Sequence, residues 1–290
     1  MKLKTILLGL LLLVVLVFVF FSLPNDAYSV KDGRFSYSQN RPVPKFNSTL
    51  LEDQPAYSLT KISFESHGAV VYSLLRLPKN VQKPPVVIIL PGATVPKEAR
   101  QNLGKLLETN GIASLVLDER GNGETTFTQQ TQGQELEAFR NNEEVNDARM
   151  TLDVLNAFDL LKAFSVNRDK VVLLGESMGG RYAILSAAID PRFAGAIIIS
   201  SSGYGLPNAP ALEQTNFIRL IDPDNYVSLI SPRPVLFIHS PGDKVIPLAS
   251  SKRTFSLAKE PKEFFTVNCP HGYCTAMDEK IVEWLKKNSG

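Results

Sequence analysis

The sequence contains little cysteine, little histidine and little net charge. Its 290 residues include two cysteines, three histidines and one tryptophan, and the formal net charge is +2. A charge this small gives no reason to expect a nucleic acid or a strongly acidic partner. Three scattered histidines and one close pair of cysteines do not form a set of metal ligands, so we expect no metal and no cofactor.

The chain also lacks internal repeats, low-complexity tracts and long blocks of like charge. Apolar residues make up 44% of the sequence and charged residues 21%, which is ordinary for a globular protein. At this length the chain can bury a large core, as one large domain or as two small ones.

Charge is absent from one long stretch near the N-terminus. Two lysines precede residues 6–23, which carry no charge and are long enough to cross most of a bilayer. Residues 1–24 are therefore predicted to be a signal anchor or a cleaved signal peptide, with a tolerable cleavage site at 27–29. The lysines place the N-terminus inside. We expect an exported, membrane-anchored protein, or a secreted one if the segment is removed.

Residues 25–57 are rich in proline, serine, asparagine and aspartate and show no periodicity, so they are predicted to be a tether or an irregular N-terminal arm. The folded domain is expected over residues 58–290. It begins with two alternating segments, Leu59–Glu65 and Ala69–Leu77, which predict a β-hairpin at one edge of a sheet. His67 lies between them and is expected to be a turn residue rather than a catalyst.

Short apolar strands alternate with helical segments through the rest of the domain. The strands are expected at Val86–Leu90, Ile112–Leu117, Val171–Leu174, Ala196–Ser200, Val235–His239 and Glu263–Val267. The helices are expected at Pro96–Thr109, Asn142–Phe164, Met178–Ile189, Leu248–Ala258 and Ala276–Lys287. This alternation predicts an α/β fold: a mostly parallel, eight-stranded sheet with helices on both faces.

One motif joins the strand at Val171–Leu174 directly to the next helix. Residues 175–179 read Gly-Glu-Ser-Met-Gly and fit the G-x-S-x-G pattern. A strand feeding into a helix through this pattern is typical of a nucleophile elbow, a sharp turn that exposes a serine. The glycines are needed because a Cβ at either position would collide with neighbouring backbone. The candidate nucleophile is Ser177.

Other polar residues follow the remaining strands, and in such sheets the chemistry lies at the carboxyl ends of the strands. Asp243 follows the strand that ends at His239, and His271 follows the last strand. The sequence therefore predicts that Ser177, Asp243 and His271 lie together. Asp222 and Asp224 remain alternatives for the acid, although Asp-Pro-Asp is typical of a turn or a helix cap.

These segments together resemble the α/β-hydrolase superfamily, over roughly residues 59–284. The resemblance rests on Gly175–Gly180 for the elbow, Asp118–Gly123 for the D-x-R-G-x-G turn, Gly242–Pro247 for the segment with the acid, and Pro270–Gly272 for the segment with the histidine. The pattern is most similar to dienelactone-hydrolase and prolyl-oligopeptidase-like esterases. Two departures stand out, since Pro91-Gly92 and His239-Ser240 each replace the usual His-Gly.

The resemblance and the residue order imply one mechanism. A serine hydroxyl needs an adjacent base, which His271 would supply, and Asp243 would orient the imidazole. The oxyanion would be held by two backbone N–H groups, those of Met178 and Ala93. Asp118, Arg120 and Gly123 are expected to form a tight turn pinned by charge and hydrogen bonds rather than to take part in catalysis.

Cys269 and Cys274 flank His271. In an oxidising compartment these cysteines would form a disulfide that closes a small ring around the histidine.

The predicted function is that of a serine hydrolase that cleaves a small-molecule carboxylic ester through an acyl-enzyme. Residues 201–231 leave room only for a short cap, which favours a fairly open cleft and small to medium acyl groups. A serine peptidase or amidase, and an acyltransferase, remain alternatives on the same triad. The alternative of another class is a non-catalytic binding protein tethered to the membrane.

Overall fold

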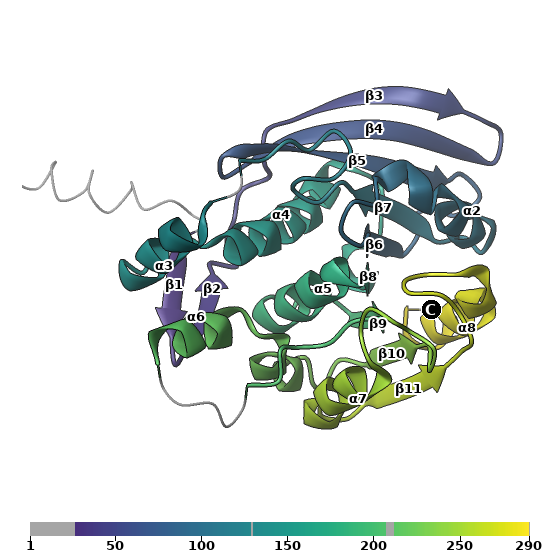
Figure 1. Ribbon diagram of the computed structural model, residues 1–290. Coiled ribbons are helices and arrows are strands. Elements are labelled where there is room, and N and C mark those ends of the chain that lie inside the picture. Colours follow the sequence, from purple (N-terminus) through teal and green to yellow (C-terminus); the bar gives the residue numbers. More distant parts are fainter. Residues whose placement is uncertain (1–26, 129, 207–211, 290) are drawn as a thin grey trace, which may run out of the picture.

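A nine-stranded sheet is the centre of the fold in the computed structural model, which describes residues 27–128, 130–206 and 212–289 (Figure 1). The order across this sheet is β11-β10-β9-β8-β6-β7-β5-β4-β3. Strands β6 to β11 pair in parallel, whereas β5, β4 and β3 pair antiparallel at one edge. The strands are β3 (Phe46–Asp53), β4 (Tyr57–Ser66), β5 (Ala69–Pro78), β6 (Val86–Leu90), β7 (Ala113–Leu117), β8 (Val171–Glu176), β9 (Gly195–Ile199), β10 (Val235–His239) and β11 (Lys262–Thr266).

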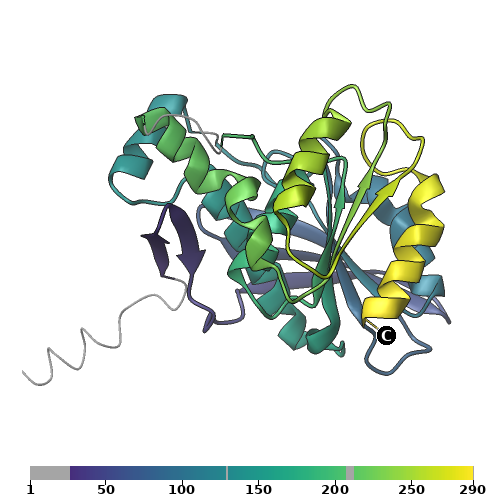
Figure 2. The same cartoon turned by 90° about the horizontal axis from the view of Figure 1, so that it is seen from below.

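The central strands are buried on both faces because successive apolar side chains point to opposite sides of the sheet. Ile88 and Leu173 pack on one face with helices α4 (Asn146–Leu160) and α5 (Met178–Ile189), and α7 (Leu248–Leu257) lies on the same side. Val87 and Leu174 pack on the other face with α2 (Gln101–Thr109) and α8 (Asp278–Ser289). Figure 2 shows the sheet between these two layers. The predicted α/β-hydrolase fold with helices on both faces is thereby confirmed, with one strand more than the eight expected.

The extra strand belongs to residues 25–57, which were expected to be an irregular tether or arm. This expectation is wrong for the described part of the segment. It forms β1 (Tyr28–Lys31), β2 (Arg34–Tyr37) and the sheet strand β3. Asp32 and Gly33 form the turn between β1 and β2 with φ angles of 52° and 69°, a conformation that suits a two-residue hairpin. The sequence Asp-Gly was the signal for this turn.

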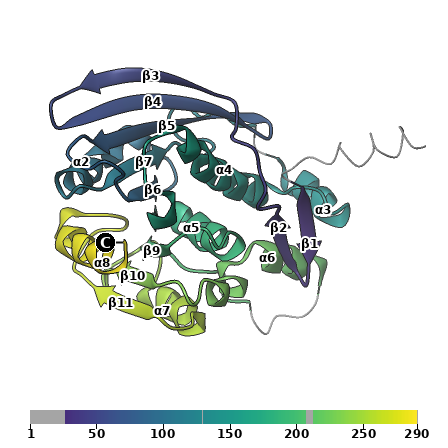
Figure 3. The same cartoon turned by 180° about the vertical axis from the view of Figure 1, so that it is seen from behind.

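Buried ion pairs fasten the same segment to the domain. Arg41 donates to Asp159 at 2.8 Å and to Asp190 at 2.7 Å, and all three side chains are buried. Two carboxylates on one guanidinium compensate its charge well. The hairpin of β1 and β2 lies beside α6 (Glu213–Ile221) (Figure 3). The segment is therefore part of the folded domain.

The cap is built from two insertions rather than one. Residues 201–231 supply α6 and the short helices η4 (Pro223–Asn225) and η5 (Val227–Leu229). The loop after β7 supplies α3 (Gln132–Arg140), which was not expected. The two helices meet through Phe139 and Phe217, whose ring centroids are 5.8 Å apart. The remaining short helices are η1 (Lys97–Arg100), η2 (Leu161–Ala163), η3 (Arg168–Lys170) and η6 (Thr275–Met277).

The predicted membrane segment, residues 1–24, lies outside the described residues. No helix in the part of the chain that the structure describes is long and apolar enough to cross a bilayer. The expectation of a transmembrane, membrane-anchored protein is therefore wrong for that part of the chain.

The strand order creates a crevice at the middle of the sheet. The chain passes from β6 to its neighbour β7 and then returns to the other side of β6 to form β8. At such a topological switch point, the loops after the two strands turn apart and leave room for a ligand. The loops that follow β6 and β8 carry Ala93 and Ser177.

Candidate active site

Ser177 lies in a strained turn between β8 and α5. Its φ of 52° and ψ of −115° fall in a region that residues with a side chain rarely adopt. A Cβ at Gly175 would lie 2.2 Å from the carbonyl oxygen of Gly179, and a Cβ at Gly179 would lie 2.2 Å from that of Leu90. Only glycine fits either position, and this is why the turn can be so tight.

The structure brings Ser177, His271 and Asp243 together in a chain of hydrogen bonds. The Nε2 atom of His271 lies 2.8 Å from the Ser177 Oγ. Its Nδ1 atom lies 2.8 Å and 3.0 Å from the two carboxylate oxygens of Asp243. The carboxylate therefore fixes the imidazole so that its other nitrogen faces the serine hydroxyl, which is the arrangement needed for a general base.

Asp243 is buried and is held in its ionised form. Burial by itself raises the pKa of this carboxyl, but hydrogen bonds from the Ile246 N–H, His271 and the Val245 N–H lower the pKa below its usual value. The loop has a further support, because the buried His239 contacts the Ile246 carbonyl through Nε2 at 2.9 Å. His239 thus supports the loop that carries Asp243, and its Nε2 is engaged there.

The alternative residues occupy other places. Asp222 accepts hydrogen bonds from the Tyr204 and Asp224 N–H groups, so it caps a turn. Asp224 binds Thr254 and Arg253. His67 contacts Glu144.

The loop after β6, residues 91–95, contains the expected oxyanion donor Ala93 and is called here the oxyanion loop. It approaches the serine closely, since a Cβ at Gly92 would lie 3.3 Å from the Ser177 Cβ. Three N–H groups of this loop have partners within the described residues. The Gly92 N–H donates to Glu176, the Thr94 N–H to Asn122 and the Val95 N–H to the Gly92 carbonyl, whereas no partner is found there for the Ala93 N–H. The Ala93 N–H is thus the candidate donor of this loop, beside that of Met178.

The side chain of Asn122 also holds the oxyanion loop, through two hydrogen bonds to its backbone. It is 3% exposed; its Nδ2 donates to the Gly92 carbonyl at 3.0 Å and its Oδ1 accepts from the Thr94 N–H at 2.7 Å. It belongs to the turn after β7, where Asp118 is buried and bonded to the ammonium of Lys97 at 2.7 Å. The expectation that this turn is pinned by charge is confirmed.

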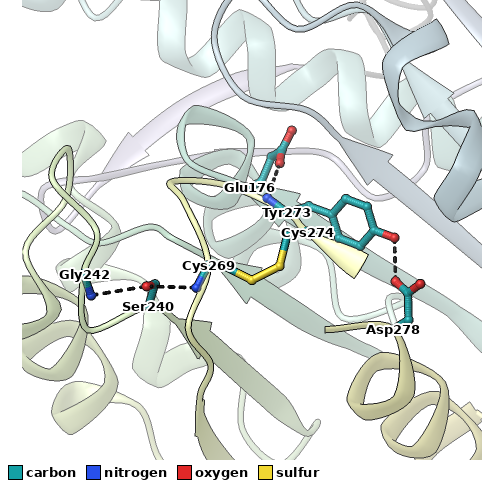
Figure 4. The surroundings of a disulfide bond; sticks show 7 residues. All are labelled: Glu176, Ser240, Gly242, Cys269, Tyr273, Cys274 and Asp278. Carbon is teal, nitrogen blue, oxygen red and sulfur yellow. Dashed lines mark hydrogen bonds between the residues drawn. A yellow bond between two sulfur atoms is a disulfide. The ribbon is translucent and has the colours of Figure 1, made fainter. Parts of the chain in front are cut away.

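The segment 268–274 is called here the histidine loop, and Cys269 and Cys274 close it with a disulfide (Figure 4). Their Cα atoms are 6.3 Å apart. The Cys269 N–H donates to the Ser240 Oγ at 3.3 Å, which ties this loop to the one that carries Asp243. On its other side the Tyr273 hydroxyl donates to Asp278 at 2.5 Å.

A pocket of about 510 Å³ opens beside Met178. Its apolar wall comes from both parts of the cap and from α4 and α5: Phe127, Met150, Met178, Tyr182, Phe217 and Ile221. Glu135, Asn146 and Asp147 add polar groups to the lining. Burial raises the pKa of Asp147, so its carboxyl favours the protonated form more than usual. The pocket adjoins Met178, the residue after Ser177, and its volume is within the range of small-molecule sites.

Two acidic residues near the site were not found from the sequence. Glu119 is 5% exposed, and neither carboxylate oxygen has a hydrogen-bond partner within the described residues. Burial raises the pKa of Glu119 well above its usual value, and the charge of Glu176 raises it further. Glu176 itself is buried and bonded on several sides. Their sequence positions, beside Asp118 and Ser177, were the available signal.

A search of the described residues finds no group of three or more histidine, cysteine, aspartate or glutamate side chains that could hold a metal ion.

Residues 82–227 match the family model described as serine aminopeptidase, S33. The chain is 31% identical to the protein YfhR of Escherichia coli (strain K12) over 132 residues, which are 40% of this chain and 43% of that protein. It is 30% identical to the 2,6-dihydropseudooxynicotine hydrolase of Paenarthrobacter nicotinovorans over 149 residues, covering 50% of this chain and 37% of the relative. The chain therefore matches less than half the length of either relative.

The solved structures share the fold. An acetyl xylan esterase from Paenibacillus sp. R4 superposes with a TM-score of 0.73 over 86% of this chain and 90% of its own, at 18% sequence identity.

Proposed function

The chain belongs to the serine aminopeptidase S33 family of α/β-hydrolases, and from this premise we propose that it hydrolyses carboxylic esters through an acyl-enzyme on Ser177. One observation carries the proposal: His271 lies 2.8 Å from the Ser177 Oγ on one nitrogen and 2.8 Å from Asp243 on the other. This geometry supports a serine nucleophile with its base and its orienting acid.

In the first half of the reaction Ser177 attacks the carbonyl carbon of the ester. The Nε2 atom of His271 takes the hydroxyl proton as the new C–O bond forms, and the Asp243 carboxylate stabilises the imidazolium. The tetrahedral intermediate then collapses, and His271 returns the proton to the leaving alcohol. In the second half a water molecule takes the place of the alcohol, and His271 removes its proton as the water oxygen attacks the acyl carbon. The second tetrahedral intermediate then breaks its bond to the Ser177 Oγ, which takes the proton back from His271 as the acid leaves.

The negative oxygen of each tetrahedral intermediate would be bound by the Met178 and Ala93 N–H groups. A Cβ at Gly179 would lie 2.2 Å from the Leu90 carbonyl oxygen, so the first turn of α5 packs against the end of β6, and this keeps the two donors close to Ser177. Loss of one such donor typically costs about 3–4 kcal/mol of transition-state stabilisation.

The pocket beside Met178 supports an acyl or alcohol group of small to medium size. Its volume of about 510 Å³ and its apolar wall suit a short chain or a single ring better than a long lipid chain. The name of one structural neighbour agrees with this class, because it is an acetyl xylan esterase. The name of one relative, 2,6-dihydropseudooxynicotine hydrolase, agrees with a hydrolase of a small molecule.

Amide hydrolysis is the second candidate, and the description of the family as serine aminopeptidase favours it. The same groups would act, with His271 protonating a leaving amine in place of an alcohol. The two candidates differ in the leaving group and not in the residues.

A fluorophosphonate probe and a substrate panel test the proposal. We expect the probe to label Ser177, and Ser177→Ala to lose labelling and at least about 10³-fold in kcat, with an unchanged melting temperature. Within the panel, nitrophenyl esters should be cleaved faster than the matching anilides. Turnover retained by the alanine variant would place the nucleophile elsewhere, and anilides cleaved faster than esters would favour the amidase.

A further inference from the structure

The side chain immediately before the nucleophile contacts both loops that the reaction needs. We propose that Glu176 is a positioning residue, which holds the oxyanion loop and the histidine loop in place around Ser177 with a single carboxylate. This inference rests on the proposed function, because it assigns Glu176 a part in the same site.

The carboxylate of Glu176 joins its own strand end to two segments that are far away in the sequence, residues 92–100 and the histidine loop. Its Oε1 accepts from the Gly92 N–H at 3.0 Å and from the Arg100 Nε at 2.8 Å. Its Oε2 accepts from the Tyr273 N–H at 2.8 Å, the contact drawn in Figure 4. Glu176 is 2% exposed, so water competes little with these bonds.

The negative charge of the Glu176 carboxylate is balanced by the nearby guanidinium of Arg100. The guanidinium of Arg100 contacts the same carboxylate through Nη2 at 2.5 Å, and it also lies 5.8 Å from the centre of the Tyr273 ring. Hydrogen bonds that involve charged groups are roughly twice as strong as neutral ones. The buried Glu176 carboxylate, paired with Arg100, therefore holds the Gly92 and Tyr273 N–H groups through strong hydrogen bonds.

Each contact lies next to a group that the proposed mechanism uses. Gly92 precedes Ala93, so the bond to the Gly92 N–H restrains the peptide next to the one that carries the oxyanion donor. Tyr273 lies two residues after His271, and the bond to its N–H restrains the loop that presents the imidazole. Because Glu176 adjoins Ser177 in the chain, this one side chain helps to hold Ser177, His271 and the Ala93 N–H in their relative positions.

A glycine allows the carboxylate to come this close to the histidine loop. Gly272 has a φ of 89°, and a Cβ there would lie 3.1 Å from the Glu176 Oε2. A carboxylate is also the side chain that suits the task, since both of its oxygens accept. Glutamine in the same place has one accepting oxygen, and its NH₂ group would face an N–H.

The test compares Glu176→Gln with the parent enzyme on a nitrophenyl ester. Misplacement of reacting groups by about 1 Å can cost about 10²-fold, so we expect kcat to fall by about 10- to 100-fold. KM should stay within about threefold, because the pocket beside Met178 is untouched. The affinity for an alkyl boronic acid, which forms a tetrahedral adduct on Ser177, should fall by the same factor as kcat/KM.

Two further variants identify the cause. Glu279→Gln removes an exposed carboxylate in the first turn of α8 and should leave kcat unchanged. The pair Glu176→Gln with Arg100→Gln removes both charges, so an effect of an unpaired Arg100 would disappear while an effect of misplaced loops would remain. We expect the pair to stay impaired. Recovery of parental kcat in the pair, or a kcat within twofold of the parent in Glu176→Gln, would overturn the proposal.

Glu176→Asp keeps the inference testable if the glutamine variant does not fold. The shorter side chain keeps the charge for Arg100 but cannot reach both loops, so we expect a smaller loss of kcat and again a nearly constant KM. A parental kcat in this variant would overturn the proposal. Failure of the proposed function is distinguishable, because the parent enzyme would then show no labelling at Ser177.

Discussion

Two buried aspartates follow two parallel strands of the sheet, and their surroundings are alike. Asp118 comes after β7 and Asp243 after β10. Each accepts hydrogen bonds from two backbone N–H groups: those of Lys97 and Glu124 for Asp118, and those of Val245 and Ile246 for Asp243. Each also accepts from one basic side chain, at 2.7 Å from Lys97 and 2.8 Å from His271.

The two sites differ in whether the basic partner has a hydrogen-bonding group left for another residue. The Lys97 side chain is fully buried and its ammonium also contacts Glu124 and Glu98, so its donors are occupied. The His271 side chain is 23% exposed, and its second nitrogen faces the Ser177 hydroxyl. A buried carboxylate with two backbone donors is therefore a structural unit. It becomes part of a candidate active site when its basic partner presents a second nitrogen to a hydroxyl, as His271 does to Ser177.

The largest effect should come from Asp243→Asn. An amide in this position can donate to Nδ1 and so stabilise the wrong tautomer of His271, a change that costs about 10⁴-fold in kcat in hydrolases with this triad. KM should change little. Steady-state kinetics on a nitrophenyl ester, with the melting temperature as control, would measure this. A loss below about 10-fold would contradict the role of Asp243.

The same variant has a defined pH signature in stability. The pKa of Asp243 is lowered on folding, so its contribution to stability is present above the unfolded value of about 3.9 and is lost as pH falls through the lower folded value. The parent should therefore lose more of its melting temperature than the asparagine variant when pH falls from about 5 to about 2. Equal losses would mean that the carboxylate gains nothing on folding.

Asp118→Asn should act on stability instead. It leaves the buried Lys97 ammonium without its main partner, and breaking a buried ion pair in this way costs about 3–5 kcal/mol. Because Asp118 touches neither Ser177 nor His271, kcat of the folded enzyme should fall by less than about 10-fold, under about 1.4 kcal/mol. Urea unfolding and kinetics on the same sample separate the two effects. A kcat loss as large as that of Asp243→Asn would erase the distinction between the aspartates.

Sequence alone could predict the residues that the strand ends present. Ser177, Asp243 and His271 each follow a short apolar strand, and parallel strands bring their carboxyl ends to one edge. The same reasoning identified the Asp118 turn, since Asp-x-Arg-Gly-x-Gly combines charge with residues suited to a tight bend. These are local patterns, and a parallel sheet places them reliably.

The supporting contacts could not be predicted because they join loops whose approach depends on side-chain packing. Glu176 meets the Gly92 N–H across 84 positions of sequence, and Asn122 meets the Gly92 carbonyl across 30. No periodicity marks either residue. The helix α3 left a local signal, the capping box of Thr131 and Gln134, but its weak apolar pattern gave no reason to expect a helix there.

The smallest effect should come from loss of the Cys269–Cys274 disulfide. This change tests how the histidine loop is held, compared with the segment that carries Lys97. Lys97 directly begins a helix, whereas His271 lies in a loop that a Cys269–Cys274 bond closes. A ring this short contributes about 2 kcal/mol in the chain-entropy model. Bonds to Asp243 and Ser240 also hold the loop, so most of its order should survive reduction.

We therefore expect turnover to fall only severalfold when the disulfide is reduced, with the fold intact. About threefold in kcat corresponds to less than 1 kcal/mol, well below the expected loss of kcat in Asp243→Asn and the expected loss of stability in Asp118→Asn. Turnover should be compared with and without reductant after thiol counting under denaturing conditions, and a Cys269→Ser, Cys274→Ser pair serves as a reductant-insensitive control. Unchanged turnover after two thiols are counted would mean that the hydrogen bonds alone hold His271. A loss as large as that of Asp243→Asn would mean that the ring, and not the carboxylate, sets its position.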